Sequence, residues 1–353
     1  MKRATPVRLG IIGAGLIGLR HAALAKSNPD LELVGFAEPS AAAMDRVKPF
    51  DVPVYADAVG MIDAEKPDGV VISAPTQNHM EIGLACVDLG IPMLMEKPVT
   101  EDVASGRRLI DAAAQAGVPI AVGHHRRFDP AVSTARDMIQ NGEIGRLLLG
   151  TAIWCQRKPD AYFDVEWRRK KGGGPVLTNL IHEVDLLRYL CGEVASVFAK
   201  TSNGVRGFEI EDTAAILYTF RNGATVSVLL SDAAQTPWSW ERATGENPDV
   251  PRMGLDCFRF VGTKGGLDFP SNDLWRTPGA EIGSWSDTLE RTAHETPERA
   301  AHRDQLDHFG RVVRGEVEPR VTGADGLASL AATVAVFRSA ETGAPVEPEY
   351  RLD

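Results

Sequence analysis

Residues 9–18 read Leu9-Gly10-Ile11-Ile12-Gly13-Ala14-Gly15-Leu16-Ile17-Gly18, and this stretch decides the fold. Its apolar first half predicts a buried strand, and the glycine spacing that follows predicts a tight turn and the start of a helix. Gly13 would make the turn, Gly15 would let the backbone approach a pyrophosphate, and Gly18 would let the helix pack closely on the strand. The N–H groups of the first helical turn, at Leu16 and Ile17, would face the phosphates.

Glu38 supports a dinucleotide site, although glycine spacing alone is a weak signal in a chain with 34 glycines. The apolar run 31–37 predicts a second strand, and Glu38 follows it directly, twenty residues after Gly18. An acid at this place accepts hydrogen bonds from the adenosine ribose hydroxyls and repels a 2′-phosphate. We therefore predict that the cofactor is NAD rather than NADP.

Composition and charge restrict the class of protein. The 353 residues suffice for two domains with full cores, and the net charge of −10 argues against a nucleic-acid partner. No apolar run is long enough to cross a membrane, and no signal-peptide pattern opens the chain. The four cysteines are scattered without metal-binding spacing, which favours reduced thiols in the cytoplasm. We expect a small molecule as the substrate.

The order of apolar segments predicts two domains. Strands alternate with helices up to residue 123, and six such strands predict a doubly wound parallel sheet for residues 1–123. Beyond residue 145 most strands follow one another directly, so we predict an α+β domain with an open, mostly antiparallel sheet for residues 124–353. We expect the C-terminal helix, 324–340, to pack back on the first domain, and segment 235–252 to be a long loop. The strands expected in the second half are 147–156, 194–201, 213–220, 224–231 and 256–261, with a hairpin turn at 221–223 and one clear helix at 182–190.

Four motifs follow one another along the chain. They are the Gly13 to Gly18 fingerprint, Glu96-Lys97-Pro98 after a strand, Gly123-His124-His125-Arg126-Arg127-Phe128-Asp129-Pro130 after the sixth strand, and Gly172-Gly173-Gly174 before His182-x-x-Asp185. Together they resemble the Gfo/Idh/MocA family of nicotinamide-dependent oxidoreductases, over nearly the whole chain. The resemblance implies a Rossmann domain, a substrate domain built on a mostly antiparallel sheet, and bound NAD(H) or NADP(H). We also expect a homo-oligomer, either a dimer or a tetramer.

The loop after the strand at 69–74 is expected beside the cofactor. Ligands of a doubly wound sheet bind beyond the carboxyl ends of its strands, so residues at those ends are candidate site residues. The loop also resembles the family's loop against the pyrophosphate and the nicotinamide ribose. His79 could equally cap the next helix. The residues predicted to contact the cofactor here are Ala74, Pro75, Thr76, Asn78 and His79.

Lys97 follows the strand at 92–95, in the motif Glu96-Lys97-Pro98. The plain alternative is a surface charge pair before a proline turn. An ammonium at this edge of the sheet can hydrogen-bond a substrate hydroxyl and stabilise the charge that develops as hydride leaves. In the family that the chain resembles, this lysine lies in the active site. We predict that Lys97 is catalytic and that Glu96 and Lys97 also lie against the cofactor; the sequence does not show whether the Lys97–Pro98 bond is cis.

His182 lies in the first turn of a predicted helix, and its imidazole could take the hydroxyl proton in oxidation or return it in reduction. The alternative is a capping or core histidine. Many members of the family carry an aspartate four positions earlier, where this chain has Thr178 followed by Asn179. Asp185 lies on the same helix face as His182 and is the candidate substitute. We predict that His182 and Asp185 are catalytic and that Thr178 and Asn179 contact the substrate.

Arg126, Trp167 and Arg168 are further candidates for substrate contact. Trp167 and Arg168 come just before the glycine run and resemble a tryptophan–arginine pair near the family's active site. They would suit a substrate with a carboxylate or several hydroxyls. A cationic run of this kind can equally be a solvated surface.

Two other groups of residues have weaker interpretations. Trp238, Trp240 and Glu241 lie in the expected loop, where they could cover a sugar face or pack on a partner subunit. A second group reads as one polar helix face, and we predict no metal site there. Its members are His302, Asp304, Asp307 and His308.

The sequence therefore predicts an NAD-dependent oxidoreductase that transfers hydride between nicotinamide and a hydroxyl or carbonyl of a sugar, polyol or related hydroxy compound. Two alternatives stay open. One is a redox-neutral enzyme that holds NAD tightly, such as a glycosidase that oxidises and re-reduces its substrate. The other is a non-catalytic, cofactor-binding regulator, against which Lys97 and His182 argue.

Overall fold

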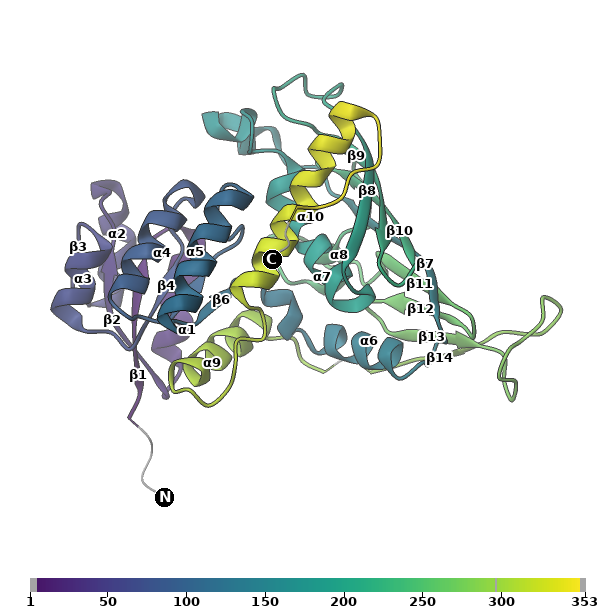
Figure 1. Ribbon diagram of the computed structural model, residues 1–353, viewed down its shortest axis with the longest axis horizontal. Helices are drawn as coiled ribbons and strands as arrows, with labels where there is room; N and C mark the ends of the chain where they lie inside the picture. Colours follow the sequence, from purple (N-terminus) through teal and green to yellow (C-terminus); the bar gives the residue numbers. More distant parts are fainter. Residues whose placement is uncertain (1–4, 296, 350–353) are drawn as a thin grey trace. The chain divides into compact units, whose positions relative to one another are not determined.

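The computed structural model describes residues 5–295 and 297–349 (Figure 1). Contacts divide the chain into two compact units. The first unit holds the stretch that ends at Phe128, together with Ala300–Leu330; the second holds Asp129–Arg299 and Ala331–Glu349. The last helix, α10 (Gly323–Thr342), therefore contributes its first part to one unit and its second part to the other.

The sheet of the first unit has six parallel strands in the order β3-β2-β1-β4-β5-β6. This confirms the predicted doubly wound sheet and its six strands. The strand order reverses between β1 and β4, and ligands of such sheets bind at this point, beyond the carboxyl ends of the strands. The strands are β1 (Val7–Ile12), β2 (Leu31–Ala37), β3 (Val54–Tyr55), β4 (Gly69–Ile72), β5 (Met93–Met95) and β6 (Ile120–Val122).

Helices cover both faces of this sheet because successive strand residues point to opposite sides. Leu9 and Ile11 pack in a cluster with side chains of α1 (Leu16–Ser27) and α9 (Ala301–Val313), whereas Gly10 between them lies against Met61 of α3. After β2 the chain forms a 3-10 turn at Ala41–Ala43, which leads directly into α2. The other helices are α2 (Met44–Val47), α3 (Ala58–Glu65), α4 (His79–Asp88) and α5 (Val103–Ala116).

Helix α9 was predicted from the sequence only as the polar helix face of residues 302–308, without its place in the first unit. Its Leu306, Phe309 and Val312 recur at helical spacing and are buried in the same cluster as β1 and β2. The first part of α10 packs in this unit too, since Gly326 lies against Val122 of β6. These contacts explain why residues 300–330 belong to the first unit, although they follow the second one in the chain.

The sheet of the second unit has eight strands in the order β14-β13-β12-β11-β7-β10-β9-β8. Its pairs are antiparallel except for β7 with β10, within the part of the chain that the structure describes, which confirms the open, mostly antiparallel sheet. Three short strands, β12 to β14, were not predicted. The strands are β7 (Leu147–Cys155), β8 (Val194–Ser202), β9 (Thr213–Phe220), β10 (Thr225–Ser231), β11 (Phe258–Gly262), β12 (Gly266–Phe269), β13 (Asp273–Arg276) and β14 (Glu290–Thr292).

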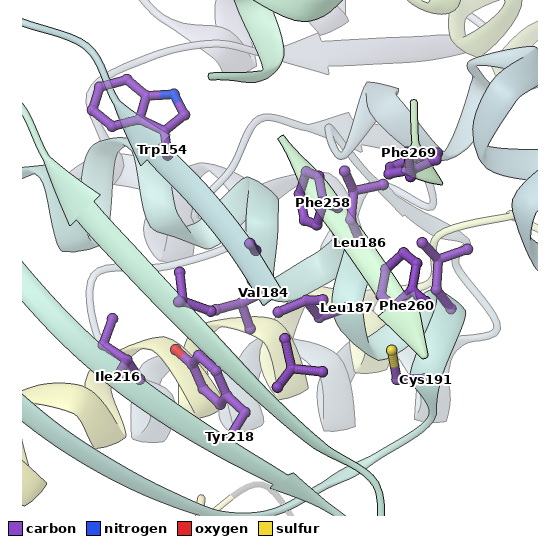
Figure 2. Close-up of a cluster of buried hydrophobic side chains, with 14 of the residues drawn as sticks. Trp154, Val184, Leu186, Leu187, Cys191, Ile216, Tyr218, Phe258, Phe260 and Phe269 are labelled. Atoms are coloured by element: carbon purple, nitrogen blue, oxygen red, sulfur yellow. The ribbon is translucent and has the colours of Figure 1, made fainter. Parts of the chain in front are cut away.

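One face of this sheet is covered by helices α6 (Pro130–Gln140) and α7 (Ile181–Cys191) and by the second part of α10. Figure 2 shows Leu186 and Leu187 of α7 among buried strand residues such as Tyr218 and Phe260. Helix α7 is therefore anchored in the core, and of its residues only His182 and Tyr189 are partly exposed. None of the described helices is long and apolar enough to cross a membrane.

The interpretation of Trp240 as a cover for a sugar face is wrong. The segment 235–252 contains a short helix, α8 (Trp240–Thr244), and the Trp240 side chain is fully buried in the core of the second unit. Its indole Nε1 donates a hydrogen bond to Glu246 (2.6 Å), while Trp154 donates to Glu241 (2.9 Å). Indole N–H groups need such acceptors when the ring is buried.

Candidate functional site

The turn between β1 and α1 leaves no room for side chains at Gly13 and Gly18. Gly13 has φ +95°, and a Cβ there would lie 2.6 Å from the Ala74 nitrogen at the end of β4. A Cβ on Gly18 would lie 2.0 Å from the Gly13 carbonyl oxygen. The Ser73 hydroxyl donates to that same oxygen (2.8 Å) and ties the turn to β4. The turn is thus held at the reversal point of the sheet.

Gly15, unlike Gly13 and Gly18, is next to open space, which fits a bound pyrophosphate. A Cβ on Gly15 would meet no atom within 4 Å, so the space beside the turn is open to a ligand. Gly15 is the N-cap of α1, and no side chain among the described residues caps this helix. Leu16 is 77% exposed at the same place. Uncapped N–H groups and the positive end of the helix dipole attract phosphate oxygens.

Glu38 lies directly after β2 with its carboxylate fixed by backbone groups. One oxygen accepts from the Ala14 N–H and the other from the Ser40 N–H, both at 2.8 Å. The first contact attaches Glu38 to the glycine turn itself. Each oxygen keeps a further lone pair, which suits the two hydroxyls of a ribose.

Lys97 lies directly after β5, next to a buried ion pair. His21 of α1 is fully buried, and its Nε2 lies 3.0 Å from a carboxylate oxygen of Glu96, whose side chain is 13% exposed. Burial alone would raise the pKa of Glu96, but the hydrogen bond and charge of His21 and the charges of Lys97 and His125 lower it to about 2. The Lys97–Pro98 peptide bond is cis. Glu96 therefore stays ionised and links the cofactor helix to the lysine loop.

Both ring nitrogens of His79 lie beside backbone carbonyl oxygens of the first unit, and a neutral imidazole donates a hydrogen bond to one of them. Its Nε2 lies 2.9 Å from the Ala74 carbonyl oxygen, and its Nδ1 lies 3.0 Å from the Pro98 carbonyl oxygen. Burial lowers the pKa of His79. The imidazole thus connects the end of β4 to the turn that follows Lys97. Between them, Thr76–Asn78 form a 3-10 turn that leads into α4, and Pro75 precedes it.

In the second unit, Thr178 and His182 lie four residues apart on one helical run. Val176–Leu180 form a π-helical turn, and α7 continues from it. Thr178, Asn179 and His182 are partly exposed, whereas the apolar residues Val176, Leu180 and Ile181 are buried. A π-helical turn is rare and is frequently found at functional sites.

Asp185 is buried, at 1% exposure, on the same helix as His182. Arg126 is also buried, at 2% exposure, in a short 3-10 segment of the first unit. Direct contact of either side chain with a substrate would need local opening, so both assignments stay predictions. Trp167 is more than half exposed, and the Arg168 guanidinium lies 4.0 Å from the centre of the Tyr162 ring.

Lys158 approaches the Thr178 hydroxyl, and sequence reasoning missed it. Its ammonium lies 3.3 Å from Thr178 Oγ1 and 3.5 Å from the buried carboxylate of Asp232. The Thr178 hydroxyl is also within 2.9 Å of the Gly174 carbonyl oxygen. Lys158 follows β7 by three residues and is twenty residues away from Thr178, and no spacing rule links the two.

In the polar helix face that was considered for a metal, three of the four side chains contact other parts of the protein. His302 stacks on His125, His308 accepts from the Arg320 N–H, and Asp307 accepts from Asn28. Within the described residues, no group of three or more His, Cys, Asp or Glu side chains is arranged to hold a metal ion.

Two family models match this chain. The model for an "Oxidoreductase family, NAD-binding Rossmann fold" matches residues 7–124, and the model for the "GFO/IDH/MocA C-terminal domain" matches residues 132–268. Each match falls within one of the two sheets and the helices around it. The glycine turn, Glu38, His79 and Lys97 all lie within the first match.

Characterised relatives and a solved structure agree with these models. An "Inositol 2-dehydrogenase" of Mycolicibacterium gilvum is 31% identical over 97% of this chain and 93% of its own length. The "Rhizopine catabolism protein MocA" of Rhizobium meliloti is 32% identical over 55% of this chain, which spans only 60% of that relative. The crystal structure of the WlbA dehydrogenase from Bordetella pertussis, in complex with NADH and UDP-GlcNAcA, superposes with a TM-score of 0.78. The two sequences are 25% identical, and the match covers 99% of this chain and 100% of the other.

Replacing Glu38 by Ala tests the ribose contact. We expect the affinity for NADH to fall roughly tenfold to a hundredfold, the loss typical of hydrogen bonds to a charged group, while binding through the pyrophosphate turn persists. Fluorescence titration of NADH and NADPH measures both affinities. Glu32→Ala, which removes an exposed acid on β2, the strand before Glu38, is the matched control. Tighter binding of NADPH than of NADH by the parent protein would contradict the assignment.

Replacing Glu96 by Gln tests the buried ion pair through its pH dependence. Lowering the pKa of Glu96 from 4.5 to about 2 means that its ionised form stabilises the fold fully above about pH 5 and less as the pH falls towards 2. The lowering corresponds to about 3 kcal/mol of unfolding free energy near neutral pH. Urea unfolding should therefore show a large deficit for Glu96→Gln at pH 7 and a smaller one at pH 3. An equal deficit at both pH values would argue against the ion pair.

Proposed function

The chain belongs to the Gfo/Idh/MocA family of oxidoreductases, and we propose that it transfers hydride between NAD and a hydroxyl or carbonyl carbon of a sugar, polyol or related hydroxy compound. The resemblance seen in the four motifs is thus confirmed, and so is NAD as the cofactor. Relatives named as inositol dehydrogenases and a D-apiose dehydrogenase support the substrate class.

One observation carries the proposal most directly. Within the first unit, Lys97 follows β5 at the same edge of the sheet as the glycine turn, and Glu96 joins it to α1 through His21. NAD, when bound, supplies the carbon that accepts or returns hydride. A cation beside the carboxyl ends of the strands, where ligands of such sheets bind, is suited to hold the reacting oxygen of a substrate.

We assign Lys97 the task of stabilising the negative charge on the reacting oxygen. Lys97 is partly buried, and its positive charge is one of the causes that lower the pKa of the neighbouring Glu96. A positioned ammonium needs no reorganisation when charge develops on the oxygen, so its contribution falls on the rate and not on cofactor binding.

We assign His182 the transfer of the hydroxyl proton. The imidazole lies at the partly exposed side of α7, on a helix that the core fixes through Leu186 and Leu187. Thr178, one turn earlier, can orient a substrate oxygen but cannot carry a charge. The proton relay therefore depends on His182 itself, with Asp185 proposed as the group that tunes it.

The activity is tested by a substrate screen monitored through nicotinamide absorbance, in both reaction directions. We expect net formation of NADH with polyols or sugars and NAD⁺, or net oxidation of NADH with the corresponding carbonyl compounds. Product formation without a net absorbance change would favour a redox-neutral enzyme. Tight NADH binding without turnover of any compound would favour a regulator.

We also propose that the enzyme is a homo-oligomer. Four large apolar side chains are exposed on one face of the second sheet. The strand register puts them on the same face. Phe198 of β8 pairs with Leu217 of β9. Leu229 of β10 pairs with residue 215 of β9 and residue 153 of β7, which lie an even number of residues from Leu217 and Leu149 and therefore on the same side of the sheet. An apolar face of this kind is typical of a protein–protein interface. Sedimentation velocity should give a species heavier than the 38.1 kDa chain, and a monomer at micromolar concentration would refute the proposal.

We propose a cytoplasmic location because the cysteines form no disulfides. All four are free thiols, and three of them are buried. Burial raises the pKa of the Cys86 thiol to about 12, so it is unreactive at neutral pH. Proteins of oxidising compartments commonly use such residues in disulfides. Cell fractionation would decide the location.

Replacing Lys97 by Ala should lower turnover by roughly 100- to 1000-fold, the usual loss for a charge-stabilising donor. The dissociation constant for NADH should change far less. Steady-state kinetics and NADH titration measure the two effects separately. Lys66→Ala, an exposed lysine of the same unit, is the control. Turnover within a few-fold of the parent would show that Lys97 is only a structural charge.

Replacing His182 by Asn should slow oxidation and flatten the rising limb of its pH–rate profile, because the amide keeps a hydrogen-bonding group but cannot titrate. NADH affinity should stay close to that of the parent. His294→Asn, an exposed histidine of the same unit, should keep the limb. A limb that survives in His182→Asn but vanishes in Asp185→Asn or Lys97→Met would place the base elsewhere.

A further inference from the structure

The helical run that carries Thr178 and His182 begins with a buried N–H group. The run consists of the π-helical turn Val176–Leu180 and α7, and Val176 is fully buried. The first N–H groups of a helix have no acceptor within it, and a buried N–H without any acceptor is costly. Here the Val176 N–H donates to a carboxylate oxygen of Glu211 at 2.8 Å. A side chain that is distant in the sequence therefore caps this helical run.

Glu211 lies between two buried residues of the loop that joins β8 to β9. These neighbours are Ile210 and Asp212. The Asp212 carboxylate accepts from the N–H groups of Val205 and Arg206, which closes the loop on itself. The backbone beside Glu211 is thus fixed on both sides, and its carboxylate reaches the helical run from a defined place.

The glycine run at 172–174 makes room for this contact. A Cβ on Gly174 would lie 2.3 Å from one carboxylate oxygen of Glu211 and 2.6 Å from the other. The φ angle of Gly174 is not positive, so an alanine there would be compatible with the backbone. The obstacle is the end of a flexible side chain, and the fold can accept alanine if Glu211 moves away. Gly174 is therefore needed for the place of the Glu211 carboxylate.

The Glu211 carboxylate also acts on the helical run through its charge. The N-terminal end of a helix carries a partial positive charge, which a negative group offsets. His182 lies six residues beyond Val176, which corresponds to about 9 Å along a helical run. Unit charges separated by about this distance still interact measurably near a protein surface, although solvent and salt weaken the interaction. The carboxylate therefore favours the protonated form of the His182 imidazole.

The charged groups that face Glu211 are one acid and one cation. Burial raises the pKa of the Glu211 carboxyl and the charge of Asp232 raises it further, whereas the backbone N–H groups and the charge of Lys158 lower it. The helix itself carries two acids close to His182, namely Glu183 and Asp185. All of these groups stay in place when Glu211 alone is changed. A difference in titration between the parent and a Glu211 variant therefore reports the charge of Glu211.

We propose that Glu211 is a positioning residue of the reaction: its carboxylate holds the first turn of the helical run, and its charge makes the His182 imidazole a stronger base. The proposal rests on the proposed function, in which His182 transfers the hydroxyl proton. The two effects are separable, because the hydrogen bond acts on geometry and the charge acts on titration.

NMR titration of His182 in the NADH-loaded protein tests the charge without requiring turnover. Ring-labelled histidine gives the signals, and the one that is missing in His182→Asn identifies His182. Glu211→Gln keeps an oxygen that can accept from the Val176 N–H and removes the charge. The pKa of His182 should fall by roughly 0.5 unit in this variant, as expected for unit charges about 9 Å apart in a partly solvated place.

Glu209→Gln, which removes an exposed acid of the same loop, is the matched control and should leave the pKa of His182 within about 0.1 unit of the parent value. An unchanged pKa in Glu211→Gln, or an equal fall in both variants, would overturn the proposal.

Gly174→Ala tests the hydrogen bond without removing a charge. In the parent background it should lower kcat roughly 3- to 30-fold, because displacement of Glu211 lets the first turn and His182 shift. Glu211→Ala should cause a similar loss. The double variant should be no slower than Glu211→Ala alone, since the alanine at position 174 then displaces no carboxylate. Losses that multiply in the double variant would contradict the proposal.

If Gly174→Ala does not fold, the comparison of Glu211→Ala with Glu211→Gln takes its place. Glu211→Ala should have the lower kcat, because only the amide keeps an acceptor for the Val176 N–H. Equal kcat values would overturn the positioning role. The dissociation constant for NADH should stay close to that of the parent in each of these variants.

Failure of this proposal and failure of the proposed function are distinguishable. A lower pKa of His182 in Glu211→Gln, without turnover of any compound, would keep the effect of Glu211 on the imidazole and remove the reaction. Turnover together with an unchanged pKa of His182 would leave the oxidoreductase standing and remove the role of Glu211.

Discussion

A turn with no room for a side chain fixes the backbone at the carboxyl ends of the strands in the first unit, where ligands of such sheets bind. Gly13 and Gly18 lie so close to each other and to the end of β4 that any Cβ would collide with backbone atoms. The cost of a methyl group at 2.0 Å from a carbonyl oxygen exceeds what a protein of ordinary stability tolerates. Because the turn is fixed, Gly15 beside it can stay open, and α1 can present uncapped N–H groups to a pyrophosphate.

The same turn is linked to the residues that carry the chemistry. Glu38 accepts from the Ala14 N–H, so the ribose contact is attached to the glycine turn itself. His21 of α1 forms a hydrogen bond with Glu96, and Glu96 directly precedes Lys97. Removing one partner of such a buried pair is costly because the other partner stays buried, but compared with apolar residues in the same place the pair adds little stability, since the desolvation of both groups opposes their attraction. We interpret its main contribution as a fixed position for the lysine loop relative to the cofactor helix.

The first unit could be predicted from the sequence because its signals are local. Strand and helix patterns alternate, and the glycine spacing and Glu38 lie within thirty residues of one another. Contacts between distant segments could not be predicted in this way. Helix α9 joins the first unit from position 301 onwards, Trp240 lies in a core rather than a loop, and Lys158 reaches Thr178 across twenty residues. Each of these depends on tertiary packing, which sequence periodicity does not contain.

The central claim is direct hydride transfer between a substrate carbon and NAD. Its most direct test uses the compound that turns over fastest in the screen, labelled with deuterium at the reacting carbon. Mass spectrometry of the nicotinamide product after oxidation by NAD⁺ should show one deuterium in each NADH formed, and the oxidised product should have lost it. Deuterium that remains in the carbohydrate product with no labelled NADH, or that is exchanged with solvent, would contradict the account.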